Sequence, residues 1–243
     1  MQRPFFTCPA ALTVLLFSAH LPAAEDPHDF SGVWQAFAAI PALAPNAVPD
    51  LTPEGEIRVA DFAARYPNPV EPAAYCVPAG VPDMMTTPRG SVEIVQAFSQ
   101  VTLLGANGQV RRVFLDDRSF PEAPSATSAG YSVGHWENDT LVIETRFLDE
   151  LLSGRWPRTS GMVVNERMTK LRRGQVTAVP DTGAETAVRD DYVLEVALTF
   201  TDPELYREPQ MLTVYFQHLT DAALPAQTCA AELWRQALDA ANP

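Results

Sequence analysis

Residues 192–200, with the sequence YVLEVALTF, are the stretch that decides the fold. Large apolar or aromatic side chains occupy every second position from Tyr192 to Phe200. Such a period of two is typical of a β-strand that buries one face. Residues 212–218, LTVYFQH, repeat the alternation, so this part of the chain is predicted to be β-sheet.

Similar short runs extend back through the chain and are separated by brief polar links. They comprise residues 92–97, 100–104, 109–115, 131–136, 140–147 and 162–171, and residues 29–34 resemble the entry to a first strand. The Asn107-Gly108 pair between two runs is a strong hairpin signal. About nine strands joined mostly by short links predict an all-β fold, an antiparallel up-and-down barrel.

The two ends of the chain have a different composition from this meander. Ten of the 22 prolines lie within residues 41–90, and proline is excluded from central strands. Residues 25–90 are therefore expected to form a strap over the barrel. Thr52 and Pro53 begin one short helix in it, with Ile57, Ala60 and Ala64 on the inner face. Residues 228–241 predict a closing amphipathic helix.

Residues 1–24 have the pattern of a secretory signal peptide. Arg3 precedes an apolar run, and the small residues Ala23 and Ala24 end the segment. We expect a single mature domain over residues 25–243, located in the periplasm or secreted. Cleavage would leave Cys76 and Cys229, which are predicted to form a disulfide, with two separate buried thiols as the alternative.

The composition of the chain and the motifs that it lacks exclude several classes of function. Acidic residues outnumber basic ones by 30 to 17, and no basic stripe is available for nucleic acid or anionic lipid. Beyond the leader, no apolar stretch approaches the ~18 residues that suggest a membrane-spanning helix. The sequence contains no metal-ligand spacing, Walker loop or dinucleotide fingerprint, so neither a metal nor another cofactor is expected.

Several motifs resemble those of a widespread family of uncharacterised secreted bacterial proteins. Residues 130–145, GYSVGHWENDTLVIET, are similar to the family pattern G-Y-S-x-G-x-W-x-x-D-T-L-V-x-E-T. Further matches are Ser31-Gly32-x-Trp34, residues 51–55, residues 76–82, Glu166-Arg167 and Asp202-Pro203-x-x-Tyr206. The resemblance implies export but carries no activity, and residues 157–160 lack a histidine that family members have. The Gly32-x-Trp34 opening is also similar to lipocalin-like barrels.

The candidate catalytic residues lie on and near the predicted hairpin over residues 131–147. His135 and Glu144 would approach each other if their strand faces coincide, and the pair could then orient a base or relay a proton. An exposed polar face with an ordinary cross-strand pair explains the same residues. Asp117, in the acidic segment before the hairpin, is the third candidate.

The candidate binding residues are arginines, aromatic residues and one histidine. An arginine from the Arg111-Arg112 pair that points into the barrel could hold a ligand carboxylate, although such charges also pair with each other at strand ends. The full binding set is Arg112, Tyr131, Trp136, Arg146, Arg167 and His218. Glu166 and Arg167 face opposite ways, so a buried one would need a partner. His218 continues the apolar face of residues 212–216, where a hydrogen-bonded core histidine is the alternative.

Three functions follow from this pattern. The first is an exported, soluble protein that binds a small, largely apolar molecule inside the barrel. The second is a cofactor-independent lyase, isomerase or hydrolase that uses acid–base residues in the barrel. The third is a structural or interaction module. A closed cavity with apolar walls would favour the first, convergence of His135 with Glu144 in a cavity would favour the second, and a filled barrel core would favour the third.

Overall fold

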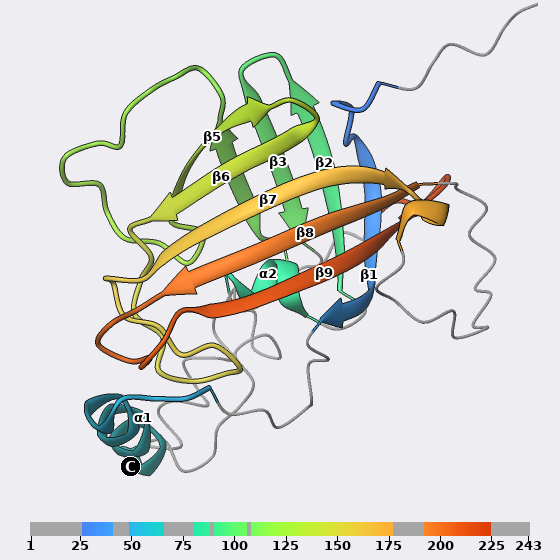
Figure 1. Ribbon diagram of the computed structural model, residues 1–243. Helices are drawn as coiled ribbons and strands as arrows, with labels where there is room; N and C mark the ends of the chain where they lie inside the picture. The colour runs from blue at the N-terminus through green and yellow to red at the C-terminus, as the bar shows by residue number, and fades with distance from the viewer. Residues whose placement is uncertain are drawn as a thin grey trace, which may run out of the picture.

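The computed structural model describes residues 26–40, 49–65, 80–87, 90–105, 108–176 and 192–224. Nine strands close into one barrel, in which each strand lies beside its neighbours in chain order (Figure 1). Their bounds are β1 Gly32–Ile40, β2 Ser91–Ala97, β3 Gln100–Gly105, β4 Val110–Phe114, β5 Tyr131–Glu137, β6 Thr140–Arg146, β7 Val163–Arg172, β8 Tyr192–Thr201 and β9 Gln210–Leu219. The predicted all-β barrel is confirmed.

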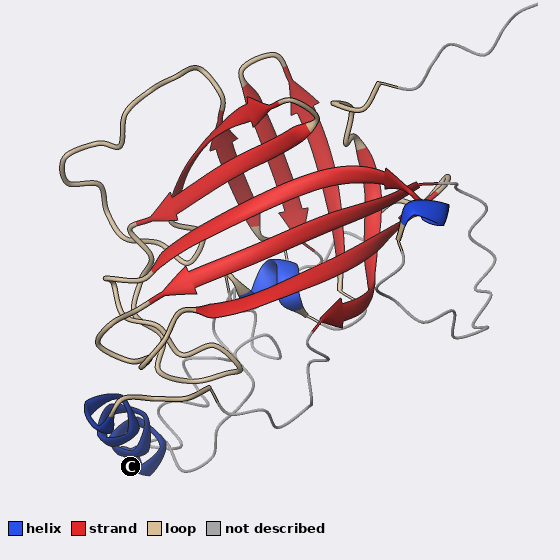
Figure 2. Cartoon of the chain, viewed as in Figure 1, coloured by secondary structure: helices blue, strands red, loops and turns tan. Residues whose placement is uncertain are grey.

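The barrel is mixed, so the prediction of a purely antiparallel barrel was wrong at one junction. β1 closes the ring against β9, and neighbouring strands are antiparallel everywhere except between β4 and β5. A ring of nine strands cannot alternate direction throughout, because an odd number forces at least one parallel pair. Parallel neighbours need a connection of about a dozen residues or more. Residues 115–130 supply it, and Figure 2 shows them as a long loop.

Short helices accompany the barrel. α1 spans Pro53–Arg65, as predicted from Thr52 and Pro53, and α2 spans Asp83–Thr86. A turn of 3-10 helix, Arg173–Gln175, follows β7. The predicted inner face of α1 was wrong: Ile57, Ala60 and Ala64 are exposed, and Gly55 is the buried residue of the helix. No helix in the described ranges is long and apolar enough to cross a membrane.

The predicted strap over residues 25–90 needs one correction, because β1 lies within that range and is a full member of the barrel. The segment before it, residues 26–31, lies against the β5–β6 turn, where His28 Nε2 is 2.8 Å from the carbonyl oxygen of Asn138. The predicted helix over residues 228–241 and both cysteines of the predicted disulfide lie outside the described residues.

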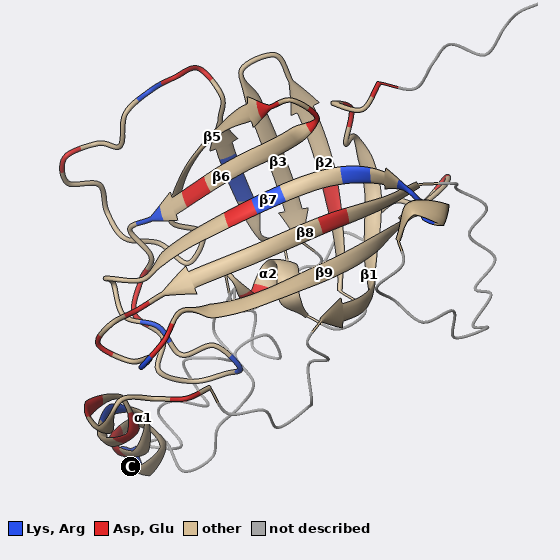
Figure 3. Cartoon of the chain, viewed as in Figure 1, with Lys and Arg blue, Asp and Glu red and all other residues tan. Residues whose placement is uncertain are grey.

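The interior of the barrel is packed with apolar side chains from all the strands. Inward-pointing residues such as Val101, Ile143, Val196 and Phe216 have at most 1% of their surface exposed. α2 adds Met85 to this core, near the end of the barrel where β3 finishes, since Met84 lies beside Gly105. Both signs of charge are distributed over the strands, and β7 carries an acidic and a basic position next to each other (Figure 3).

Candidate functional site

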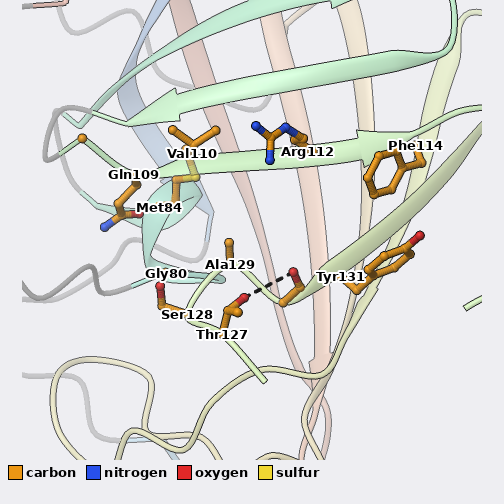
Figure 4. Close-up of a pocket in the computed structure, with 12 residues that line it drawn as sticks. Gly80, Met84, Gln109, Val110, Arg112, Phe114, Thr127, Ser128, Ala129 and Tyr131 are labelled. Atoms are coloured by element: carbon orange, nitrogen blue, oxygen red, sulfur yellow. Dashed lines mark hydrogen bonds between the residues drawn. The ribbon is translucent and has the colours of Figure 1, made fainter. Parts of the chain in front are cut away.

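A pocket of about 470 Å³ opens where β4 and β5 separate. The two strands share only two residue pairs, Val113 with Ser132 and Phe114 with Val133. The first half of β4 therefore has no strand partner on the side of β5. The pocket is lined by Gly80, Met84, Gly108, Gln109, Val110, Arg112, Phe114 and residues 127–131 (Figure 4). Val110, Arg112 and Phe114, the three lining residues of β4, point away from the core. The pocket therefore lies outside the barrel wall.

Backbone contacts hold the loop that forms one side of the pocket. The Val81 amide donates a hydrogen bond to the Ser128 carbonyl at 2.9 Å, and the Gly130 amide donates to the Thr127 carbonyl at 3.1 Å. Gly80 has a φ of +74° and packs directly on the Ser128 carbonyl, where a Cβ atom would collide. Glycine is required at this position because the two backbones meet there.

Aromatic side chains form one end of the pocket. The rings of Phe114 and Tyr131 lie 5.2 Å apart, and the Phe120 ring is 6.0 Å from Tyr131. The guanidinium of Arg118 stacks 3.8 Å from the Phe114 ring centre. Its Nε donates to Asp116 Oδ1 at 2.6 Å. Bonding to the Asp116 carboxylate and to the Tyr131 hydroxyl raises the pKa of Arg118 further above its usual range.

Two polar side chains of the lining, those of Arg112 and Gln109, have polar atoms without a hydrogen-bond partner among the described residues. Arg112 lies between Val110 and Phe114 on the outer face of β4 (Figure 4). It forms no hydrogen bond or ion pair with any residue in the described part of the chain. At the opposite end, the buried Oε1 of Gln109 also lacks a hydrogen-bond partner there. The pocket thus combines apolar walls with a few polar groups, as small-molecule sites do.

Arg111 has the opposite environment from Arg112, because it points into the barrel. Its Nε donates to Ser132 Oγ at 3.0 Å, and its Nη2 donates to Thr145 Oγ1 at 2.8 Å. Both terminal nitrogens bind the Glu166 carboxylate, with Nη1 3.1 Å from Oε1. All four side chains have at most 1% of their surface exposed. Ser132 and Thr145 come from one motif of the resemblance and Glu166 from another, and the barrel brings them together around Arg111.

The sequence predicted that a buried residue of the Glu166-Arg167 pair would need a partner, but it did not assign Arg111 to Glu166 and placed Arg112 and Arg167 in the binding set instead. A usable signal was present in the alternation of the strands. Arg111 shares its face with Val113, and Glu166 shares its face with Val164 and Met168. When a charged residue has apolar residues two positions before and after it, all three lie on one face of the strand. Such a pattern indicates that the charge is buried and requires a partner.

The faces of His135 and Glu144 do coincide, but on the outside of the barrel. Glu144 pairs with Val133 and His135 pairs with Val142, which makes the two side chains diagonal neighbours. His135 Nε2 lies 3.2 Å from Glu137 Oε1, while Glu144 binds Arg146. His135 is 58% exposed, so the arrangement is an outer polar face.

The ion pairs on this outer face also involve Arg167, which donates to Glu137 Oε2 at 2.9 Å. Bonds from Arg167 and from His135 lower the pKa of Glu137. These charges satisfy one another at the surface, and they lie away from the residues that line the pocket.

Two of the nine predicted catalytic and binding residues, Arg112 and Tyr131, come together at the pocket. The others lie elsewhere or beside it. Asp117 is exposed in the loop after β4 and has a φ of +55°. Arg146 stacks 4.6 Å from the Phe120 ring centre. The Trp136 ring packs 5.2 Å from Phe30, and the His218 ring lies 4.9 Å from that of Trp34.

Sequence comparisons add no family to this description. No protein-family model matches the chain, and a search of curated proteins found no similar sequence. The resemblance to secreted bacterial proteins therefore stays a prediction from the motifs quoted above. The geometry of the pocket is the observation from which a function can be inferred.

Proposed function

We propose that this protein binds a small, largely apolar molecule in the pocket between β4, the loop over residues 127–130 and α2. The observation that carries the proposal is a volume of about 470 Å³ with walls from Val110, Phe114, Met84 and Tyr131. Sites for small molecules have volumes of roughly 300–1,000 Å³ and mainly apolar linings. Burying such a surface on a ligand would contribute about 25 cal/mol per Å² before the costs of ordering are subtracted.

The pocket changes the expected position of the ligand. The sequence predicted binding inside the barrel, whereas the interior is filled by side chains such as Leu103, Leu141 and Phe200, each fully buried. A ligand in the pocket would rest on the outer wall, at the junction where strand pairing is shortest. Packed interiors contain few voids larger than a water molecule, so the outer pocket is the better site.

Binding is favoured over catalysis by the chemistry of the lining. Of the side chains that commonly transfer protons, the described lining contains Tyr131 and no Asp, Glu, His, Lys or Cys, so it holds no acid–base pair. His135 and Glu144 are outside this set and bind other side chains. We therefore rank a binding protein above the cofactor-independent enzyme.

We further propose that the chain is exported, with residues 1–24 removed and Cys76 bonded to Cys229. The support is the pattern of the leader and the even number of cysteines that its removal leaves. Intact mass measurement of protein from a bacterial periplasm tests both points. A mass for residues 25–243 that is two hydrogens below the reduced value is the expected result.

Native mass spectrometry of the same periplasmic preparation tests the binding function. We expect a reproducible small adduct on the wild-type protein. Ala129→Trp places an indole in the pocket lining and should remove the adduct. Ala123→Trp introduces the same side chain at an exposed position of the same loop, outside the lining, and should retain it. An adduct that survives Ala129→Trp would place the ligand elsewhere.

A further inference from the structure

We infer that the ligand of this pocket is a carboxylic acid with an apolar body and that Arg112 binds its carboxylate. The inference rests on the proposed binding function and extends it to the chemical class of the ligand. It concerns the guanidinium of Arg112 and the apolar surface on both sides of it.

The charge of the lining is unusual for this protein. The chain has a formal net charge of -13, yet the pocket lining holds one charged side chain among its described residues, and it is an arginine. No acidic side chain in the lining would repel an anion. The net negative charge of the protein repels anions in general, so an anion that binds would be held where a basic side chain such as Arg112 offsets that repulsion.

The guanidinium of Arg112 is available for a ligand, in contrast to the arginines around it. On the described surface, Arg118 binds Asp116, Arg146 binds Glu144 and Arg167 binds Glu137. Arg112 has no such partner in the same ranges. The planar fork of a guanidinium matches a carboxylate with two parallel hydrogen bonds, a geometry that a lysine cannot reproduce.

Apolar side chains flank Arg112 along β4 and across the sheet. Val110 and Phe114 precede and follow it on the same outer face of β4. Arg112 pairs with Thr102, and its neighbour Val110 pairs with Leu104. Val110 remains 47% exposed. A small inorganic anion would leave this apolar surface in water, whereas an acid with an apolar body would cover it while its carboxylate meets Arg112.

The walls at the two ends of the pocket favour a particular apolar body of the ligand. Phe114 and Tyr131 lie on one side of Arg112, and Met84 lies on the other (Figure 4). Aromatic and thioether side chains pack well against ring systems. An aryl or alkyl–aryl carboxylate therefore satisfies both the charge and the walls of the site.

Matched fluorescent probes test the inference on the full mature protein. 1-Pyrenebutyrate carries the carboxylate, and 1-pyrenebutyramide has the same ring and chain with a neutral amide. We expect the butyrate to bind wild-type protein about tenfold more tightly than the amide at low salt, the range expected for a hydrogen bond to a charged group. Raising the ionic strength should reduce this preference.

Variants at two arginines locate the effect. Arg112→Gln should weaken butyrate binding by about tenfold and leave amide binding within about twofold, which abolishes the preference. Arg167→Gln removes another exposed arginine of the outer surface, away from the pocket, and should retain the preference. Urea unfolding midpoints for each variant verify that the barrel is intact.

The outcomes separate the two proposals. Equal affinity of the wild-type protein for both probes, or a preference that persists in Arg112→Gln, would overturn the carboxylate inference. Amide binding that Ala129→Trp removes would then still support the pocket as a ligand site. Failure of both probes to bind the wild-type protein would count against the proposed function and against the inference with it.

Discussion

Two adjacent arginines show how much a single position decides in this barrel. Arg111 is 1% exposed and binds Glu166, Ser132 and Thr145, whereas its neighbour Arg112 lies on the outer wall. Successive side chains of a strand point to opposite faces. Arg111 is therefore buried in an ion pair, whereas Arg112 points outward and can bind a ligand. The buried network connects β4 to β5, β6 and β7 through side chains.

The buried ion pair predicts strongly non-additive mutational effects. Arg111→Met and Glu166→Met should each lower the free energy of unfolding by about 3–5 kcal/mol, because each leaves an unpaired charge in the core. The double variant should be much less destabilised than the sum of the two, since it leaves no buried charge. Urea denaturation of the four proteins measures the coupling.

Arg112→Met is the matched control for this cycle. The residue is exposed and lacks a described partner, so we expect a change within about 0.5 kcal/mol. Single core variants with effects as small as that control would show that the Arg111–Glu166 pair contributes little to stability.

At the scale of the element, α1 shows why an expected helix face can be wrong. Apolar spacing suggested that Ile57 faces inward, yet it is 56% exposed. The helix packs Val59 against the core instead, and polar and backbone contacts also attach it. Thr52 Oγ1 accepts a hydrogen bond from the Gly55 amide at 2.9 Å and donates one to the Glu204 carbonyl at 2.8 Å. Arg58 also donates to Glu204, at 2.6 Å.

Gly55 should therefore respond to substitution in an unusual direction. Alanine at a glycine position in a helix interior normally stabilises by roughly 0.5–1 kcal/mol. At Gly55 the added Cβ would lie 2.6 Å from the Leu205 carbonyl oxygen, a backbone atom that cannot move aside cheaply. We expect Gly55→Ala to lower the melting temperature and to accelerate proteolysis within residues 53–65.

The control for this variant is Ala63→Gly, which removes a Cβ at an exposed position of the same helix. It tests helix propensity alone, and we expect a loss of about 1 kcal/mol or less. An unchanged or raised melting temperature for Gly55→Ala would contradict the close packing of α1 on the 202–206 segment.

At the scale of the whole molecule, barrel closure is uneven. β7 and β8 share ten residue pairs, whereas β4 and β5 share two and are parallel. The odd number of strands requires a parallel junction somewhere, and the 16-residue connection over residues 115–130 sets it between β4 and β5. The pocket forms at this junction because the first half of β4 has no strand partner on the side of β5.

Hydrogen exchange should report this unevenness. Backbone amides of β4 and β5 should exchange at least tenfold faster than those at the centre of β8, because local opening requires fewer hydrogen bonds to break at the short junction. Addition of a pocket ligand should slow exchange in β4 and residues 127–131 while leaving β8 unchanged. Uniform protection around the barrel would show that the side-chain network of Arg111 compensates fully for the short pairing.

The sequence by itself determined the local structure of this protein. The pattern of short apolar runs located eight of the nine strands within a few residues of their bounds, whereas only the entry to β1 was recognised. Thr52 with Pro53 located the start of α1. Strand pattern and helix capping are properties of neighbouring residues. Tertiary structure alone decided which residues pair across the barrel, where the parallel junction lies and which arginine lines the pocket. Those features depend on register and closure between strands far apart in the chain, and local spacing does not contain that information.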